Sequence, residues 1–390
     1  MTLSTNRLAV AAAFATQAFI YITLAIRLPK VADQWDLSTT GLSMALLLMV
    51  LLAGAGSVLA EQVAARRDSA LPLRAGLVLV AVGMPMVVLA DSLALGVVAM
   101  AVYGTGLGMV DAATNMQAVA LEHRYQRPIL PSFHGAWTVG AILGSLLALT
   151  TGSMDDRAPA MLAVLPALLV FAPFLAAAGL PAGPGDSDIP WRPIMLVGTA
   201  MALFYMVDVA AQTWGASYAV DVFNTETGMN AAGVSAYLVA SGAVRLAGDT
   251  LVRRVGAVPV LRVGAVVGAA GLAVIVMAPT WPIAVAGFAL TGAGLAVVAP
   301  LSFSAAAGLA KIGPDESDRS RVDSVIARFN LFNYAGALLG SVMTGLVGGQ
   351  NLRWGFALPA LLVLAIIPLA SSFVTGRKAH AGSASMAPPA

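Results

Sequence analysis

Apolar runs of about twenty residues follow one another along almost the whole chain. A run of that length, wound into a helix, crosses the ~30 Å hydrocarbon core of a bilayer. The runs are continuous and do not alternate apolar with polar residues, so a transmembrane β-barrel is excluded. Of the 390 residues, 59% are hydrophobic and 10% are charged, whereas about a quarter of residues are charged in soluble domains. The pattern predicts an all-α protein that crosses the membrane many times.

The number of runs predicts the topology. We count twelve, and the interruption "PAGPGDSDIPWRP" (181–193), rich in Pro, Gly and Asp, divides them into six and six. We expect an N-terminal six-helix bundle over 1–180, a cytoplasmic linker over 181–192, a C-terminal six-helix bundle over 193–376 and a disordered tail over 377–390. The spans lie at about 7–29, 38–62, 71–90, 94–121, 128–152, 158–180, 193–220, 230–252, 258–277, 281–310, 322–348 and 353–374.

The basic residues indicate how the chain is threaded, because Lys and Arg favour cytoplasmic loops. With both termini in the cytoplasm, fifteen of the twenty-one Lys and Arg residues lie inside and four lie outside. Residues 8–26 are apolar for too long to be a cleavable signal peptide, so we expect them to form the first span. The chain is therefore expected to be a multi-pass protein with both termini in the cytoplasm.

The two halves resemble each other. "FHGAWTVGAILGS" (133–145) aligns with "FNLFNYAGALLGS" (329–341) at an offset of 196, and "TGLG" (105–108) is echoed by "TGAG" (291–294). Two parallel six-helix repeats are typical of transporters that rock around a site at the repeat interface. The echo places Val297 and Leu301 opposite Asp111 and Asn115, so the polar groups are distributed unequally between the halves.

The loop between the eighth and ninth spans carries a distinctive pattern. "RLAGDTLVRRVG" (245–256) places a Gly-Asp pair at a helix end, followed by basic residues and a Gly. It resembles a loop motif of the major facilitator superfamily, which the chain resembles over essentially its full length. The resemblance implies the major facilitator fold and a gating role for Arg245, Asp249 and Arg253. The equivalent loop of the first half has Ala60 or Glu61 where the Asp is usual.

Spans 4 and 5 narrow the resemblance. "GLGMVDAATNMQAVAL" (106–121) and "LPSFHGAWTVGAILG" (130–144) are similar to the fucose–proton symporter group, in which an acid and an Asn stand at the places of Asp111 and Asn115. The likeness is closer to a bacterial MosC/YbjJ-like branch, which implies the bacterial cytoplasmic (inner) membrane. The fucose symporters carry a second acid in span 1, where this chain has Gln17 and Tyr21.

Two of the nineteen acidic residues, Asp111 and Asp208, lie near the centre of a predicted span. A charge at that depth is costly and normally faces a water-filled cavity. Because burial favours the neutral form of a carboxyl group, such a side chain can take and release a proton near neutral pH. We predict that Asp111 is a coupling-proton site, with Asp208 and His134 as further candidates. The alternative is that these groups only bond neighbouring helices or a loop carbonyl.

Several other polar side chains in the spans are candidates for substrate contacts. Amide and hydroxyl groups suit hydroxyl-rich ligands and an aromatic ring suits a sugar ring, although Asn also joins membrane helices and Trp is common at membrane interfaces. Pro300 is expected to kink span 10 and to serve as a hinge. The candidates are Gln17, Tyr21, Asn115, Trp137, Tyr205, Gln212, Asn330 and Asn333.

No sequence motif supports an enzyme. There is no cysteine, no zinc-binding HExxH, no Walker loop and no dinucleotide fingerprint. We therefore expect no cofactor, no metal and no nucleic-acid partner. The prediction is a monomeric, proton-coupled secondary transporter of a small polar, sugar- or polyol-like molecule that works by alternating access. The alternative is a proton-driven exporter of lipophilic or cationic compounds.

Overall fold

The computed structural model of the chain describes residues 3–125, 129–150, 157–175, 191–226, 228–310, 325, 329 and 331–373. Across these ranges the secondary structure is helical and contains no strand. The predicted linker and tail lie almost entirely outside them, so the domain boundaries remain a prediction. The N-terminal half contains α1 (Leu3–Ile26), α2 (Leu28–Gln34), α3 (Thr39–Arg66), α4 (Ala70–Leu89), α5 (Leu93–Tyr125), α6 (Leu130–Thr150), a 3₁₀ turn (Ala158–Ala163) and α7 (Val164–Leu169).

The C-terminal half repeats this pattern of long helices. It contains α8 (Trp191–Phe223), a 3₁₀ turn (Met229–Ala231), α9 (Ala232–Val255), α10 (Ala257–Met277), α11 (Trp281–Leu295), α12 (Val298–Ala310), a helical stretch over 331–347 that ends in a π turn (Leu339–Met343) and α14 (Thr344–Val347), then α15 (Leu352–Leu362), a 3₁₀ turn (Val363–Ala365), α16 (Ile366–Leu369) and a last 3₁₀ turn (Ala370–Phe373).

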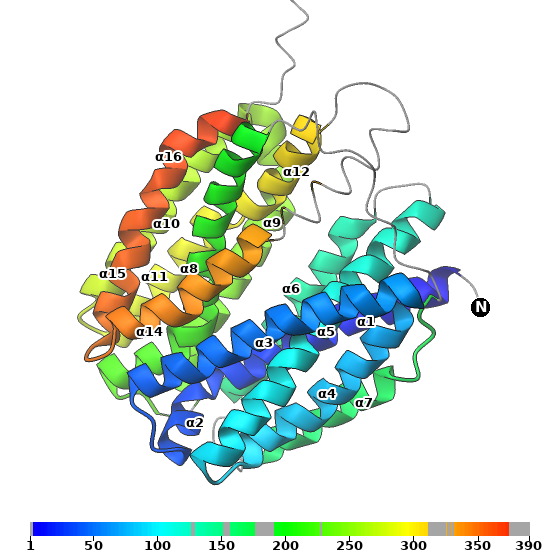
Figure 1. Cartoon of the computed structure of the whole chain (residues 1–390). Coiled ribbons are helices and arrows are strands. Elements are labelled where there is room, and N and C mark those ends of the chain that lie inside the picture. The colour runs from blue at the N-terminus through cyan, green and yellow to red at the C-terminus, as the bar shows by residue number, and fades with distance from the viewer. Residues whose placement is uncertain are drawn as a thin grey trace, which may run out of the picture.

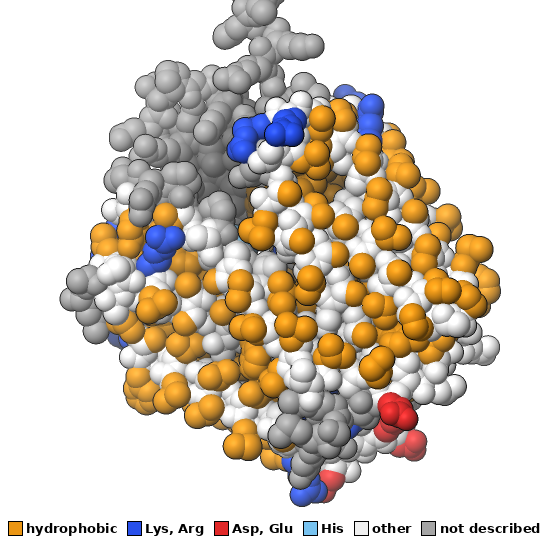
Figure 2. Space-filling model, turned by 180° about the vertical axis from the view of Figure 1, so that it is seen from behind, with side chains coloured by type: hydrophobic (Ala, Val, Ile, Leu, Met, Phe, Trp, Pro, Cys, Tyr) orange, Lys and Arg blue, Asp and Glu red, His pale blue; other side chains and the backbone are white. Residues whose placement is uncertain are grey.

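Ten helices of the described chain are long and apolar enough to cross a membrane. Two shorter apolar helices, Ala158–Leu169 and Leu331–Val347, stand at the places of the sixth and eleventh predicted spans. Figure 1 shows the helices of the N-terminal half in one group and those of the C-terminal half in another. Apolar side chains cover the middle of the face seen in Figure 2, and charged side chains lie toward its edges. The predicted all-α membrane fold of two six-helix halves is confirmed.

The sixth span ends earlier than expected. Its helix stops at Leu169, because Pro173 four residues later has no N–H to donate to the Leu169 carbonyl and its ring would clash with that group. Side chains of the N-terminal half then bond the irregular backbone: Arg74 donates to the carbonyl oxygens of Val170 (3.0 Å) and Ala172 (3.3 Å), and Asn6 to that of Pro173 (2.6 Å). Non-helical backbone is thus tolerated where protein groups satisfy it.

The pseudo-symmetry of spans 5 and 11 is visible in individual contacts. Any side chain at Gly140 on α6 would collide with the carbonyl oxygen of Ala15 on α1. The aligned glycine of the second half, Gly336, lies equally close to the carbonyl oxygen of Ala202 on α8. One turn further, Gly144 and Gly340 meet Phe19 and Met206 in the same way. The offset of 196 read from the sequence is therefore the structural one in this pair of spans.

The echo in spans 4 and 10 is two residues out of register. Gly104 lies against the carbonyl of Met49, and Gly292 against that of Tyr237. Both pairs are related by 188 residues, whereas the "TGLG" and "TGAG" segments are related by 186. The residue equivalent to Asp111 is therefore Ala299, not Val297, and the residue equivalent to Asn115 is Phe303, not Leu301. Glycines spaced two residues apart match in both alignments, which is why the sequence comparison gave the wrong register. The span 10 residues opposite Asp111 and Asn115 are apolar in either alignment.

Helix packing in the N-terminal half depends on Gly108. Its Cα faces the backbone of Ala53, and a Cβ atom would overlap the carbonyl oxygen of that residue. We expect Gly108→Ala to push α5 away from α3 and to cost at least about 1–3 kcal/mol, as overpacking does. The melting temperature in detergent measures the effect. Gly54→Ala on α3 is the matched control, since no atom lies within 4 Å of the added carbon; an equal loss in both variants would contradict the packing argument.

Candidate functional site

Asp111 lies on α5 at the contact between the two halves. The Tyr334 hydroxyl, from the C-terminal half, donates to Oδ2 of Asp111 at 3.1 Å. The same hydroxyl oxygen lies 3.1 Å from Oγ of Ser57 on α3. The Gln17 side chain on α1 also lies beside the Asp111 carboxyl group and interacts with it. The carboxyl group is half-buried, so it is enclosed by polar partners but not sealed from its surroundings.

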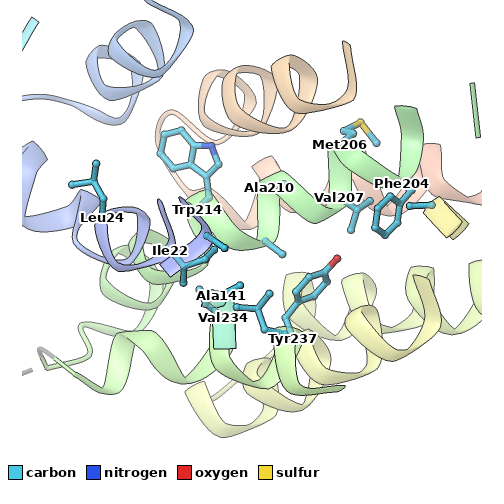
Figure 3. Close-up of a cluster of buried hydrophobic side chains, with 14 of the residues drawn as sticks. Ile22, Leu24, Ala141, Phe204, Met206, Val207, Ala210, Trp214, Val234 and Tyr237 are labelled. Carbon is cyan, nitrogen blue, oxygen red and sulfur yellow. The ribbon is translucent and has the colours of Figure 1, made fainter. Parts of the chain in front are cut away.

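Asp208 lies on α8 and is bonded within its own half. The Tyr237 hydroxyl on α9 donates to Oδ1 of Asp208 at 2.7 Å, and the Gln212 side chain lies beside the same carboxyl group and interacts with it. Figure 3 shows Tyr237 with its hydroxyl directed toward α8, beside buried apolar side chains from α1, α6, α8 and α9. Asp208 is 7% exposed. It is therefore the more deeply enclosed of the two carboxyl groups.

Tyr205 connects the two acids electrostatically. It lies one turn before Asp208 on α8 and is half-buried. Its hydroxyl group lies close enough to Asp208, Asp111 and Arg245 to interact electrostatically with their charges. The carboxyl groups of Asp111 and Asp208, one from each half, therefore both lie within electrostatic range of the same tyrosine side chain.

Arg245 compensates for a broken helix. Pro300 has no N–H to donate to the carbonyl of Ala296 four residues earlier, and the helix of span 10 is interrupted between Leu295 and Val298. Nε of Arg245 donates to that free carbonyl oxygen at 3.1 Å. The expected kink at Pro300 is thus an interruption of the helix, with an arginine side chain in place of the missing backbone donor.

Arg245 also reaches the other half of the protein. Its Nη1 donates to Oγ1 of Thr138 on α6 at 3.3 Å. Ser57 and Arg245 occupy equivalent positions at the offset of 188, and Thr138 and Tyr334 do so at the offset of 196. The Tyr334–Ser57 and Arg245–Thr138 contacts are therefore pseudo-symmetric counterparts, each joining one half to the other.

A third group of contacts joins the halves at the end of the fold far from the N-terminus. The hydroxyls of Tyr21 on α1 and Thr213 on α8 lie 3.1 Å apart. Nδ2 of Asn230 donates to the carbonyl of Ile26 at 3.4 Å. At the same end α2 contacts α8, and α14 contacts α3 (Figure 1). The halves are thus held together at mid-span and at this end.

The other predicted residues have different surroundings. The Asn115 amide donates to the carbonyl of Asp111 on its own helix (2.9 Å), and Arg253 donates to Thr250 one turn earlier (3.1 Å). His134 is exposed on α6 and packs edge-on against Phe14, with 5.6 Å between ring centroids. Trp137 and Asn333 are half-buried. Asn330 and the Asp249 side chain lie outside the described part of the chain.

Sequence reasoning missed four hydroxyl-bearing partners: Ser57, Thr213, Tyr237 and Tyr334. Each bonds a group in another helix, and none stands out in an apolar span because Ser, Thr and Tyr are common there. Tyr334 had the clearest signal, since it directly follows Asn333. Among the residues described, no three His, Asp or Glu side chains come close enough together to hold a metal ion. The site is therefore built from hydroxyl, amide and carboxyl groups and one guanidinium.

Comparisons with known proteins agree with this architecture. No family model matches the chain. An uncharacterized transporter, y4wD of Sinorhizobium fredii, is 28% identical over 378 residues, which cover 93% of this chain and 96% of that protein. An uncharacterized MFS-type transporter of Yersinia pestis is 27% identical over 333 residues, or 82% and 84% of the two chains. The membrane protein MosC of Rhizobium meliloti is 23% identical over 69% of this chain and 65% of its own.

Solved structures share the fold at lower identity. The nucleoside transporter NupG superposes with a TM-score of 0.72 at 13% identity and covers 95% of this chain and 99% of its own. The Escherichia coli fucose:proton symporter FucP gives 0.60 at 17% identity over 94% and 98%. Over nearly its full length the chain is thus similar in sequence to uncharacterized transporters, one of them of the MFS type, and it shares its fold with the solved transporters NupG and FucP.

Proposed function

We propose that the protein is a proton-coupled secondary transporter that moves a small, hydroxyl-rich polar molecule by alternating access. The proposal rests on one observation above all, the hydrogen bond between Asp111 in the N-terminal half and Tyr334 in the C-terminal half. A titratable group that bonds across the moving interface links proton binding to the separation of the halves. Asp111 is the proposed coupling residue.

The strength of the Asp111–Tyr334 bond depends on protonation. A hydrogen bond to a charged carboxylate is roughly twice as strong as one between neutral groups. When Asp111 takes up a proton, the bond to Tyr334 weakens and separating the halves at mid-span costs less. A proton therefore favours one conformation over the other, as coupled transport requires.

The polar side chains of the spans support a hydroxyl-rich substrate over a lipophilic cation. Half-buried Tyr21, Tyr205, Asn333 and Trp137 come from four different spans and offer hydroxyl, amide and indole groups. Met201, Met206 and Phe204, which could have formed an apolar pocket, are buried in the packing of α8. Gln212 and Asp208, which interact with each other on α8, add an amide and a carboxyl group. Sites on one fold serve unrelated ligands, so the proposal depends on these residues and not on the neighbours' substrates.

The orientation of the chain in the membrane indicates which side the proposed site opens to. With both termini in the cytoplasm, the contacts of Tyr21 with Thr213 and of Asn230 with Ile26 close the outer end. The substrate would then enter or leave from the cytoplasmic side in this conformation. We propose that Arg245 holds the halves together through Thr138 and is released when they separate, and that His134 and Arg253 act at the cytoplasmic end of this path.

The test is proton flux in proteoliposomes loaded with a pH-sensitive dye. Polyols, sugars, amino sugars, amino acids and lipophilic cations are added in turn to the purified full-length protein. We expect hydroxyl-rich compounds to move protons and empty liposomes to show no response. Flux with lipophilic cations alone would favour an exporter instead. Binding of a polyol without proton flux would contradict proton coupling.

A further inference from the structure

Tyr103 on α5 lines two small voids. One is lined by Thr16 and Gln17 of α1, by Tyr103 and by apolar side chains of α4, α5 and α7. The other is lined by Tyr21, Tyr103, Thr213 and apolar side chains of α1, α3 and α5. Each offers about 10 Å³ to the centre of a water molecule. One buried water needs roughly 10–15 Å³ on this measure.

The side chains around the voids include polar atoms without partners. The Tyr103 side chain is fully buried, yet its hydroxyl has no hydrogen-bond partner in the protein. Gln17 is 8% exposed and its Oε1 has no partner either. A buried polar group without a hydrogen-bond partner destabilises the folded state. Both groups line the first void, and one water molecule there would donate to Gln17 Oε1 and bond the Tyr103 hydroxyl.

We propose that both voids are internal water sites and that Tyr103 is a positioning residue for Asp111. The first water bonds Gln17 and Tyr103, and the second bonds Tyr103 to the Tyr21–Thr213 pair. The chain of hydrogen bonds then runs from Asp111 through Gln17 and Tyr103 to the contact that closes the outer end. Tyr103 touches neither substrate nor proton and acts by fixing the direction in which the Gln17 amide points. This assignment rests on the proposed role of Asp111.

The groups facing Asp111 come from several elements. Gln17 lies on α1, Tyr205 on α8 and Tyr334 in the stretch 331–347, while Ser57 and Glu61 on α3 interact with the Tyr334 side chain. Tyr103 acts on this set only through Gln17. Loss of its hydroxyl therefore changes the interaction of Gln17 with Asp111 and leaves the Tyr334 bond in place.

X-ray footprinting with mass spectrometry tests the waters without any substrate. Radiolysis makes hydroxyl radicals from water, buried water included, so a side chain beside an internal water is oxidised faster than one in dry packing. Tyr218 is the matched control, because it is also fully buried and its hydroxyl donates to the carbonyl of Ile275. We expect Tyr103 to be oxidised several-fold faster than Tyr218. Equal rates would overturn the water sites.

Infrared difference spectroscopy tests the link to Asp111. The carboxyl band of protonated Asp111 is the band that Asp111→Asn removes, and its pH midpoint can be followed without transport. We expect Tyr103→Phe to move that midpoint by half a pH unit or more and Tyr218→Phe to leave it in place. An unmoved midpoint in Tyr103→Phe would overturn the positioning role. If Asp111→Asn removes no band at any pH, the proposed proton site fails, and footprinting still decides whether the waters are present.

Discussion

Asp111→Asn is expected to abolish proton-driven accumulation of the substrate while exchange of substrate across the membrane continues. Asn keeps the size of the side chain and can still accept a hydrogen bond from Tyr334, but it cannot bind a proton. A pH gradient of one unit drives about tenfold accumulation for each coupled proton, because one unit is worth about 1.4 kcal/mol. We expect that ratio to fall to equilibration. Uptake and counterflow in proteoliposomes measure the two modes separately.

Two further variants sharpen this prediction. Tyr334→Phe removes the hydroxyl that bonds Asp111 but not the proton site. It should weaken coupling by a factor of roughly 2 to 10 without abolishing it, because the bond is stronger by about 0.5–1.5 kcal/mol when the carboxyl group is charged than when it is neutral. Asp91→Asn, at an exposed loop position, is the matched control and should behave like wild type. Full accumulation by Asp111→Asn would remove Asp111 from the proton role and leave it a structural one.

The fold and the acids of the site were predictable because their signals are local and rare. Continuous apolar runs have one stable solution in a bilayer, a helix with all its backbone bonds internal. Asp111 and Asp208 stand out because an acid is expensive at the centre of a span. The repeat in spans 5 and 11 was also readable, because Gly140 and Gly336 make the same close contact in the two halves.

The partners of these acids could not be read from the sequence because they depend on geometry between helices. Nothing in the sequence indicates that the Tyr334 hydroxyl, and not Asn115, is the group that bonds the Asp111 carboxylate. The role of Arg245 could not be read from the sequence either. Its acceptor is the backbone carbonyl of Ala296, which lacks a helical partner because Pro300 has no N–H. The register error in spans 4 and 10 arose because regularly spaced glycines match equally well when shifted by two residues.

Arg245→Gln is expected to have the second-largest effect, with transport reduced at least tenfold. The substitution removes the charge and weakens the bonds to the Ala296 carbonyl and to Thr138. It also leaves the buried carboxyl group of Asp208 without the positive charge with which it interacts. Removing one member of a buried charge pair costs about 3–5 kcal/mol when the pair is fully enclosed. Because Arg245 is only half-buried, we expect less, and a lower melting temperature in detergent.

A double variant distinguishes the loss of the Arg245 charge from a general loss of structure. The double variant Asp208→Asn with Arg245→Gln removes both charges. Its melting temperature should therefore be higher than that of Arg245→Gln alone, although the bond to Thr138 is weakened in both variants. Arg192→Gln, at an exposed position in the first turn of α8, is the matched control and should leave both measurements unchanged. Recovery of stability without recovery of transport would assign Asp208 and Arg245 to the transport cycle itself. No recovery of either would mean that Arg245 acts through the Ala296 carbonyl and the break at Pro300, and that its charge is unimportant.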